Sequence, residues 1–309
     1  MLTSVASALG TAACAGSSHS SHPAISGRAS PPAVVAATPR PRAGWHPTAS
    51  GPNQGPEFQW MLDHPLDVHN ANDMGGPGTT LYDIDGIINP ASTIRSLHSL
   101  NDKVICYIEV GAAGNYYSAA DEGIAVTYFA QLKAAGDLGR RVSGFPEYYL
   151  NINSASTLRI IEAMIRQQCA VKGFDAVEPD IDDSYTDETG FRISEVQNIT
   201  FDKVLGAYAH SLGLAWGQKN GDNDRQFSAA LVSTADFLLD EECNFYTTCG
   251  IVTPPYVAAR KLVLNAEYTD DWGAGTSSDL GRFCAFDTSH HIDGTLFTSS
   301  LAGPRHACR

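Results

Sequence analysis

The residues with the clearest chemical capacity lie in one stretch, which reads Phe174-Asp-Ala-Val-Glu-Pro-Asp-Ile-Asp-Asp183. This is a short apolar strand pattern that runs directly into a cluster of carboxylates. Because alternate side chains of a strand point to opposite faces, Glu178 and Asp180 lie on the same face. Burying several acids at a strand end is costly unless they have partners or a task. The stretch therefore predicts either a catalytic strand end or a solvated acidic loop that caps a strand.

Clustered carboxylates support two kinds of chemistry. Two acids that face each other across a sugar-sized cleft are the minimum apparatus for glycoside hydrolysis, because one protonates the leaving oxygen while the other attacks or activates water. Asp180 and Glu241 are the best-placed pair for these roles. The alternative is a divalent ion that Asp-x-Asp and Glu-x-Asp pairs hold for phosphodiester cleavage. No calcium loop begins at Asp180, since Tyr185 stands where such a loop requires glycine.

Strand-like and helical segments alternate along most of the chain. Strand patterns occur at 79–85, 103–109, 148–153, 174–180, 214–220, 237–243, 261–268 and 283–289. Helical spacing occurs at 91–100, 158–171, 201–212, 227–235 and 256–260. Eight alternating repeats predict an α/β fold, a closed (β/α)8 TIM barrel preceded by a disordered N-terminal linker. A doubly wound open sheet is the alternative, but it requires a Gly-rich phosphate loop after the first strand, and none is present. Residues 58–62 are either a further strand or a plug at one end of the barrel.

The ends of the predicted strands are polar. Active residues of a TIM barrel sit where its strands end, at the carboxyl-terminal face. The polar strand ends are Asp83-Ile-Asp85, Tyr107-Ile-Glu109, Glu178-Pro-Asp180, Gln218-Lys-Asn220, Asp240-Glu-Glu242, Glu267-Tyr268 and Asp287. We therefore expect an acid-lined mouth, with Lys219 as its cation.

Around the catalytic pair we expect residues that contact or orient the sugar. These are Asp83, Asp85, Tyr107, Glu178, Lys219, Asn220 and Glu267. Hydrogen bonds inside the barrel would explain the same residues equally well. Trp60, Trp216 and Trp272 either stack on sugar rings or belong to the core, which is the commoner place for a large aromatic side chain.

The chain before the barrel is of a different composition. Residues 1–14 resemble the end of an export signal, with Thr11-Ala-Ala-Cys14 as an imperfect lipoprotein box. Residues 15–56 are rich in Ser, Ala, Pro and Gly, which predicts a flexible linker, and residues 57–309 form the glycosidase domain. No stretch reaches the ~20 apolar residues of a membrane span. We expect a secreted protein or a cell-envelope lipoprotein, whose only membrane tether would be Cys14.

The cysteines fit the same compartment. Apart from Cys14 there are six, which are an even number and show no Cys-x-x-Cys spacing. In an exported protein such cysteines indicate disulfides rather than a metal site. The expected pairs are Cys243 with Cys249, Cys284 with Cys308, and Cys106 with Cys169.

The charge and the motifs that are absent narrow the function. The net charge of -14 argues against nucleic acid as the partner, because a negative field repels phosphate and favours neutral or cationic ligands. Gly-x-Ser-x-Gly is absent, which disfavours a serine hydrolase. The histidines do not cluster, and we expect neither a metal ion nor another cofactor.

Several of these motifs occur in the order of a known family. They are Leu81-Tyr-Asp-Ile-Asp85, Val104-Ile-Cys-Tyr-Ile108, Lys172-Gly-Phe-Asp-Ala-Val-Glu-Pro-Asp180, Ala209-His-Ser-Leu-Gly-Leu214, Gln218-Lys-Asn220, Asp240-Glu-Glu-Cys243 and Glu267-Tyr268. Over about residues 58–290 the chain resembles the endo-α-1,4-polygalactosaminidases, glycoside hydrolase family 114. The resemblance implies a TIM barrel that cleaves α-1,4-linked galactosamine polymers with retention. It also implies that Asp180 is the nucleophile and Glu241 the acid/base.

The chain departs from the family pattern in three loops. Glu109-Val-Gly111 stands where the family has Ser-x-Gly, Tyr149-Leu-Asn-Ile152 replaces Trp-Leu-Asp-Ile, and Asp183-Ser-Tyr185 replaces Asp-Gly-Tyr. These loops shape the subsites, so the polymer and its acetylation state stay open. Two other functions also stay open at this point. One is a non-catalytic carbohydrate-binding barrel, and the other is a metal-dependent hydrolase that uses the same acidic mouth.

Overall fold

Eight parallel strands form a nearly closed barrel in the computed structural model, which describes residues 44–48, 55–221, 223–301 and 305–308. Their order around the sheet is β1 (Glu57–Met61), β2 (Thr79–Asp85), β3 (Lys103–Glu109), β7 (Ala176–Asp180), β8 (Ala215–Lys219), β9 (Phe237–Glu241), β10 (Leu262–Tyr268) and β11 (Asp293–Phe297). Each strand pairs in parallel with its neighbour in this order. β12 (His306–Ala307) adds an antiparallel strand beside β11.

The first and last parallel strands meet through aromatic side chains. The rings of Phe58 on β1 and Phe297 on β11 lie 5.3 Å apart, and those of Trp60 and Phe297 lie 6.2 Å apart. These contacts bring the two ends of the sheet together. The predicted (β/α)8 fold is therefore confirmed.

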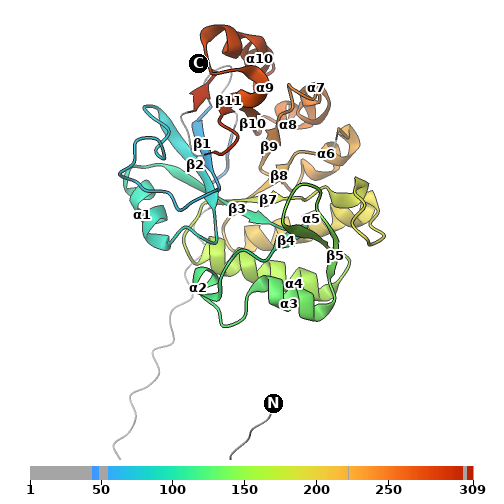
Figure 1. The fold of residues 1–309 in the computed structure, drawn as a ribbon. Coiled ribbons are helices and arrows are strands. Elements are labelled where there is room, and N and C mark those ends of the chain that lie inside the picture. The colour runs from blue at the N-terminus through green and yellow to red at the C-terminus, as the bar shows by residue number, and fades with distance from the viewer. Residues whose placement is uncertain (1–43, 49–54, 222, 302–304, 309) are drawn as a thin grey trace, which may run out of the picture. The chain divides into compact units, whose positions relative to one another are not determined.

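The helices lie around the strands (Figure 1). They are α1 (Ala91–Ser99), α2 (Ala119–Glu122), α3 (Tyr128–Ala135), α4 (Ala155–Met164), α5 (Glu195–Ser211), α6 (Arg225–Leu231), α7 (Cys249–Val252), α8 (Pro254–Ala258), α9 (Thr269–Trp272) and α10 (Ser277–Ser289). A π-helical turn, η1 (Ile165–Ala170), continues α4, and a 3-10 turn, η2 (Ser184–Thr186), follows β7. The predicted helices at 91–100, 158–171, 201–212, 227–235 and 256–260 correspond to α1, α4 with η1, α5, α6 and α8.

Two of the predicted strands are wrong as barrel strands. Residues 283–289 form the second half of α10, where Phe283 and Asp287 are both buried at a helical spacing of four. Residues 148–153 overlap β6 (Glu147–Leu150), which belongs to a separate antiparallel sheet with β4 (Ala112–Gly114) and β5 (Leu138–Arg141). β1 and β11 take their two places in the barrel.

The strands carry an apolar layer at one end of the barrel interior. Leu81, Ile105, Ala176, Ala215 and Phe237 belong to one buried cluster. On each of their strands a polar residue follows four residues later on the same face, and on β2, β3 and β7 the residue two positions later is polar as well. A second cluster packs the outer faces of the strands against the surrounding helices. Period-two alternation thus stacks a polar layer above an apolar one inside the barrel.

Three disulfides join Cys106 to Cys169, Cys243 to Cys249 and Cys284 to Cys308. These are the pairs expected from the sequence. Cys14, with the rest of residues 1–43, lies outside the described residues. No helix within the described part of the chain is long and apolar enough to cross a membrane.

A short part of the segment expected to be linker contacts the barrel. Thr48 forms an antiparallel bridge with Lys261, and Trp45 packs against the interior cluster. Residues 44–48 therefore lie against the domain that we had expected to begin at residue 57.

Gly111, just after β3, gives a test of how closely two strand ends approach. A Cβ at this position would overlap the carbonyl oxygen of Ile181, which follows β7. We expect Gly111→Ala to lower the free energy of unfolding by about 1–3 kcal/mol, as other overpacking changes do. Urea unfolding measures the effect.

The matched control is Gly281→Ala on α10, where an added Cβ meets no atom within 4 Å. Alanine there should leave stability unchanged or raise it by about 0.5–1 kcal/mol, because glycine disfavours helix. Equal effects of the two substitutions would contradict the close approach at Gly111.

Candidate active site

A buried ammonium group occupies the centre of the barrel mouth. Lys219 Nζ lies 3.0 Å from Asp180 Oδ1, 3.1 Å from Glu241 Oε2 and 3.5 Å from Glu178 Oε1. Its side chain is only 3% exposed, and Nζ also lies 5.0 Å from the centre of the Trp60 ring. One cation therefore joins carboxylates from β7 and β9.

The surrounding carboxylates keep this lysine charged. Burial on its own lowers the pKa of Lys219, but the charges of Asp180, Glu241 and Glu178 together raise it well above its ordinary value. Burial raises the pKa of Glu178 to about 7, although the Lys219 charge opposes this. Trp60 Nε1 donates a hydrogen bond of 3.2 Å to Glu178 Oε2. Glu178 is thus a buried support for Lys219.

Asp180, the last residue of β7, is held on both carboxylate oxygens. Tyr107 donates its hydroxyl to Oδ2 at 2.8 Å, and Lys219 donates to Oδ1 at 3.0 Å. Burial and the charge of Asp180 raise the pKa of Tyr107 well above its ordinary value, so its hydroxyl stays protonated and donates. Asp180 itself is 19% exposed. It combines a fixed orientation with access to solvent.

Glu241, the last residue of β9, is positioned in a similar way. Tyr268 donates its hydroxyl to Oε1 at 2.5 Å, while Lys219 lies against Oε2. The backbone N–H of Glu241 donates to Asn220 Oδ1 at 2.9 Å. The side chain is 28% exposed and lines a cleft. Glu241 is therefore the more accessible of the two candidate catalytic acids.

The backbone turns sharply after each of these three strands. Ile181, Asn220 and Glu242 directly follow Asp180, Lys219 and Glu241, and their φ angles are +55°, +49° and +58°. Left-handed conformations are unfavourable for residues with a Cβ, most of all for a β-branched one such as Ile181. Three of the nine described non-glycine residues with a positive φ therefore follow the strand ends whose side chains meet around Lys219.

A neutral acid lies beneath Glu178. Asp83 is completely buried, and its two oxygens have no hydrogen-bond donor among the described residues. Burial, followed by the charge of Glu178, raises the pKa of Asp83 well above its ordinary value. A raised pKa favours the protonated form of Asp83, which lowers the repulsion between Asp83 and Glu178. Glu178, Asp180 and Glu241 then remain as the carboxylates that face the Lys219 charge.

A cleft of about 580 Å³ opens beside Glu241. Its lining includes the carboxylates of Asp183, Asp240 and Glu242. Burial raises the pKa of Asp240 to about 8, and Oδ2 of that residue has no hydrogen-bond partner in the described structure. The lining is completed by Phe145, Asn220, Gly221, Asn223, Tyr246, Thr248 and Val252. The cleft is an acidic groove with aromatic side chains, which suits a cationic or sugar-like ligand.

A family model described as glycoside-hydrolase family GH114 matches residues 36–309. The chain belongs to glycoside hydrolase family 114. The resemblance predicted from the motifs is thereby confirmed, and the protein is a glycoside hydrolase. A comparison with curated protein sequences found no match.

Two solved structures are similar to this member of family 114. The structure of Aspergillus fumigatus Ega3 in complex with galactosamine is 25% identical, with a TM-score of 0.72, and the match covers 86% of this chain and 98% of that one. The glycoside hydrolase domain of PelA from Pseudomonas aeruginosa is 12% identical, with a TM-score of 0.55, over 80% of this chain and 96% of that one. The second similarity concerns the fold alone.

The structure brings most of the predicted site residues of this glycoside hydrolase together. Tyr107, Glu178, Lys219 and Asn220 contact Asp180 or Glu241, and Asp83 supports Glu178. Asp85 has other partners, because it accepts hydrogen bonds from the backbone of Ile87 and Ile88 and from Tyr117.

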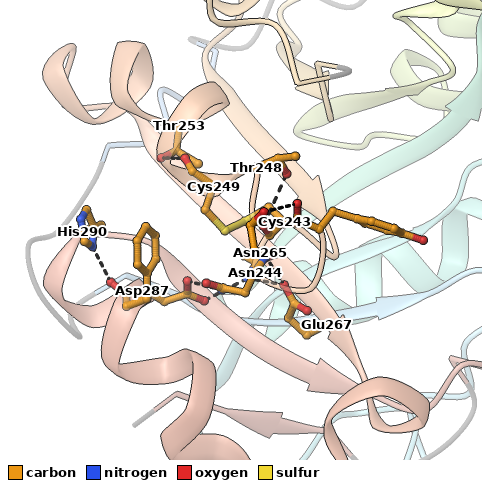
Figure 2. Close-up of a disulfide and its surroundings, with 12 residues drawn as sticks. Cys243, Asn244, Thr248, Cys249, Thr253, Asn265, Glu267, Asp287 and His290 are labelled. Atoms are coloured by element: carbon orange, nitrogen blue, oxygen red, sulfur yellow. Dashed lines mark hydrogen bonds between the residues drawn. A yellow bond between two sulfur atoms is a disulfide. The ribbon is translucent and has the colours of Figure 1, made fainter.

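Glu267 also lies apart from the mouth, on the outer face of β10. It accepts hydrogen bonds from the backbone of Asn244 at 2.8 Å, from Asn265 Nδ2 at 3.1 Å and from Trp272 Nε1 at 2.5 Å. Asn244 and Asn265 also donate to Asp287 on α10. Figure 2 shows this network next to the Cys243–Cys249 disulfide. Glu267 therefore supports the loop after β9 and does not face the barrel interior.

The aromatic residues of the site differ from those proposed from the sequence. Trp60 and Trp216 are 2% and 1% exposed, so they belong to the core, and Trp272 is bonded to Glu267. Tyr268 is the group that sequence reasoning left out of the site. The alternation of side chains along β10 indicated its position, because Leu264, Ala266 and Tyr268 share the inner face of that strand.

The residues present are not arranged as a metal site. Within the described residues, no group of three or more His, Cys, Asp and Glu side chains is placed to hold a metal ion. Lys219 already lies between Asp180, Glu241 and Glu178 and supplies the positive charge there.

Removing the Lys219 charge should destabilise the fold. In Lys219→Met, three carboxylates around a buried position lose their common cation, and we expect the free energy of unfolding to fall by about 3–5 kcal/mol at pH 7. Adding Glu178→Gln should restore part of the loss, because it removes one of the unbalanced charges. Urea unfolding of the single and double variants measures both effects.

The matched control is Lys133→Met, on the exposed surface of α3. Its stability should stay within about 0.5 kcal/mol of wild type. A Lys219→Met protein as stable as this control would show that the central ion-pair cluster is unimportant for the fold.

Asp287 gives a test of pH dependence outside the mouth. Burial raises its pKa to about 7, although hydrogen bonds from Asn265 and Asn244 oppose the rise. Between about pH 4 and pH 7 the folded protein keeps a proton that the unfolded chain releases. The contribution of Asp287 to stability therefore falls as pH rises through this window and is constant above it.

We expect the free energy of unfolding of wild type to fall more steeply between pH 5 and pH 7 than that of Asp287→Asn. The difference in slope is at most about 1.4 kcal/mol per pH unit. Urea unfolding at pH 5, 6 and 7 gives the two slopes. If they were equal, Asp287 would be ionised throughout this range.

Proposed function

We propose that this protein is an exported, endo-acting glycoside hydrolase that cleaves α-1,4-linked galactosamine-containing polysaccharide. Asp180 is the nucleophile and Glu241 is the general acid/base. The observation that carries the proposal is the shared contact of these two carboxylates with Lys219, at 3.0 and 3.1 Å. The two acids come from alternate strands of the barrel and meet at its carboxyl-terminal face, where TIM-barrel enzymes carry out their chemistry.

The spacing of the two acids supports a retaining mechanism. Their oxygens on either side of Lys219 Nζ can be no farther apart than the sum of the two contacts, 3.0 and 3.1 Å. That upper limit for the two nearest oxygens falls between the carboxyl separation of about 5–5.5 Å found in retaining enzymes and the separation of about 6.5–9.5 Å found in inverting ones, and any bend at Nζ brings the pair toward the retaining value.

The environments of the two acids fit their proposed roles. Asp180 receives hydrogen bonds from Tyr107 and Lys219, which fix the orientation of its carboxylate. Asp180 attacks the anomeric carbon while Glu241, which must carry a proton for this step, protonates the leaving oxygen, and a glycosyl–enzyme ester forms. Glu241 then takes a proton from the water that hydrolyses this ester, which returns both side chains to their starting states. Tyr268 orients Glu241 for both proton transfers.

The substrate class is supported by charge. Galactosamine units without acetyl groups carry ammonium groups, and the cleft is lined by Asp183, Asp240 and Glu242, acidic side chains whose charged forms a bound cation favours. The similar Ega3 structure contains bound galactosamine. The net charge of -14 gives long-range attraction for such a polymer and none for nucleic acid.

Export is supported by the three disulfides, because such bonds persist in oxidising compartments. Lipidation at Cys14 remains a prediction from the sequence, since that residue lies outside the described part of the chain.

Asp180→Asn and Glu241→Gln test the assignment. Each should lower kcat on a partly deacetylated α-1,4-galactosamine polymer by at least about 10²–10⁴-fold, the usual contribution of a group of this kind, while the circular dichroism spectrum stays that of wild type. Reducing-end release measures turnover. Glu162→Gln on the outer helix α4 is the matched control and should keep wild-type turnover.

Other outcomes identify the competing functions. A wild-type protein that retains the polymer on a column but releases no reducing ends would be a carbohydrate-binding barrel. A protein that chelator inactivates, and that an added divalent ion restores, would be a metal-dependent hydrolase. Near wild-type turnover in either carboxylate variant would refute the assignment of the catalytic pair.

A further inference from the structure

Two exposed aromatic side chains line the cleft beside Glu241. Phe145 is 59% exposed and Tyr246 is 61% exposed. They come from two segments far apart in sequence, the turn between β5 and β6 and the loop between β9 and α7. We propose that Phe145 and Tyr246 are stacking platforms that bind galactosamine rings of the polymer next to the point of cleavage.

The lining of the cleft supports an amino-sugar occupant. A sugar ring presents C–H groups on its faces and polar groups at its edge, so it pairs an aromatic face with nearby hydrogen-bonding groups. The cleft provides both, since Asp183, Asp240 and Glu242 line it together with the two rings. A ligand cation is also attracted to the face of a tyrosine or phenylalanine ring. Aromatic rings among carboxylates therefore favour galactosamine units over neutral sugars.

Tyr246 is presented by a fixed loop. The Cys243–Cys249 disulfide closes this loop, the Tyr246 N–H donates to the Glu242 carbonyl at 2.9 Å, and the Thr248 N–H donates to the Cys243 carbonyl at 2.8 Å. Asn244 anchors the loop from below (Figure 2), with its N–H 2.8 Å from Glu267 Oε1 and its side-chain amide 2.6 Å from Asp287 Oδ1. This support also gives the outer Glu267–Asp287 network a function. It holds a binding surface in place before the ligand arrives, which lowers the entropy cost of binding.

Phe145 is held by a short turn. The Phe145 N–H donates to the Val142 carbonyl at 3.4 Å, and Arg141 donates to the Phe145 carbonyl at 3.2 Å. Gly144 within the turn has a φ of +85°, a conformation that glycine adopts without cost. The turn belongs to the antiparallel sheet β4-β6-β5, which is an addition to the barrel. Both platforms therefore lie on segments outside the eight barrel strands.

The inference rests on the proposed function and extends it to chain length. If rings stack beside the catalytic pair, the enzyme gains affinity from units that do not react. Longer chains then bind better than short ones, as an endo-acting enzyme requires. Loss of a platform should raise KM on long substrates while kcat stays nearly constant, because a uniform binding contribution is removed.

The test compares Phe145→Ala and Tyr246→Ala with wild type on α-1,4-galactosamine oligomers of increasing length and on the long polymer. Each variant should raise KM on the polymer roughly three- to tenfold, as expected for one aromatic contact. The effect should shrink on the shortest oligomer that is cleaved. The Tyr246→Phe variant keeps the ring and should recover most of the affinity that the alanine variant loses. Val196→Ala, 71% exposed on α5, is the control that should keep wild-type KM.

A second measurement separates binding from catalysis. In the Asp180→Asn background, Phe145→Ala and Tyr246→Ala should each weaken retention of the uncleaved polymer by the same factor by which that substitution raises KM on the polymer. If wild type cleaves the polymer and both alanine variants keep the KM of Val196→Ala, the proposal that Phe145 and Tyr246 stack on sugar rings is wrong, whereas the proposed function stands. If wild type does not cleave the polymer, the proposed function itself fails, and the platforms fail with it.

Discussion

The site depends on one buried ammonium group. A lysine that is 3% exposed would normally lose its proton, but Lys219 lies within 3.5 Å of three carboxylates and is kept charged by them. The dependence is mutual, because Asp180 and Glu241 could not approach each other without a cation between them. Asp83 and Glu178 reduce the surplus of negative charge, since burial raises the pKa of both. Electrostatics thus sets the distance between the two proposed catalytic acids.

The barrel places these groups through the simplest property of a strand. On β7, Ala176, Glu178 and Asp180 share the inner face, so the apolar interior and the polar mouth are successive layers of one period-two pattern. β7, β8 and β9 end at Asp180, Lys219 and Glu241, and the residue that follows each of these three has a positive φ. The backbone leaves the barrel as soon as the side chain is in place. This arrangement lets loops vary while the charged cluster is retained.

The inner residues of the strands could be predicted from the sequence because their pattern is local. The Phe174–Asp183 stretch and the strand ends at Lys219 and Glu241 follow from alternation, and the Cys243–Cys249 disulfide follows from its short spacing, whereas Cys106 and Cys169 are paired only because they remain. The barrel-strand assignment for residues 283–289 failed because a seven-residue apolar and polar mixture fits a helix face as well as a strand, and Phe283 and Asp287 are buried in both interpretations. The prediction that Glu267 contacts or orients the sugar was wrong for a related reason. Its neighbour Tyr268 faces inward, and a shift of one residue moves a side chain to the other face of a sheet.

The groups that the sequence could not reveal are those whose position depends on contacts between distant segments. Trp60, Trp216 and Trp272 are the obvious candidates for sugar stacking. The first two lie in the core, however, and Trp272 donates a hydrogen bond to Glu267. Phe145 and Tyr246 carry no local signal, since a turn and a disulfide-closed loop bring them to the same cleft. The division has a physical basis. Catalysis requires fixed charges, which rigid strands provide, whereas recognition of a polymer requires an extended surface, which the added sheet and the clipped loop provide. The three departures from the family pattern lie outside the Lys219 cluster, because Glu109 ends β3, Tyr149 lies in the added sheet and Asp183 lies in the loop after β7. Differences between relatives in the polymer that they cleave should therefore arise from these segments and leave the Lys219 cluster unchanged.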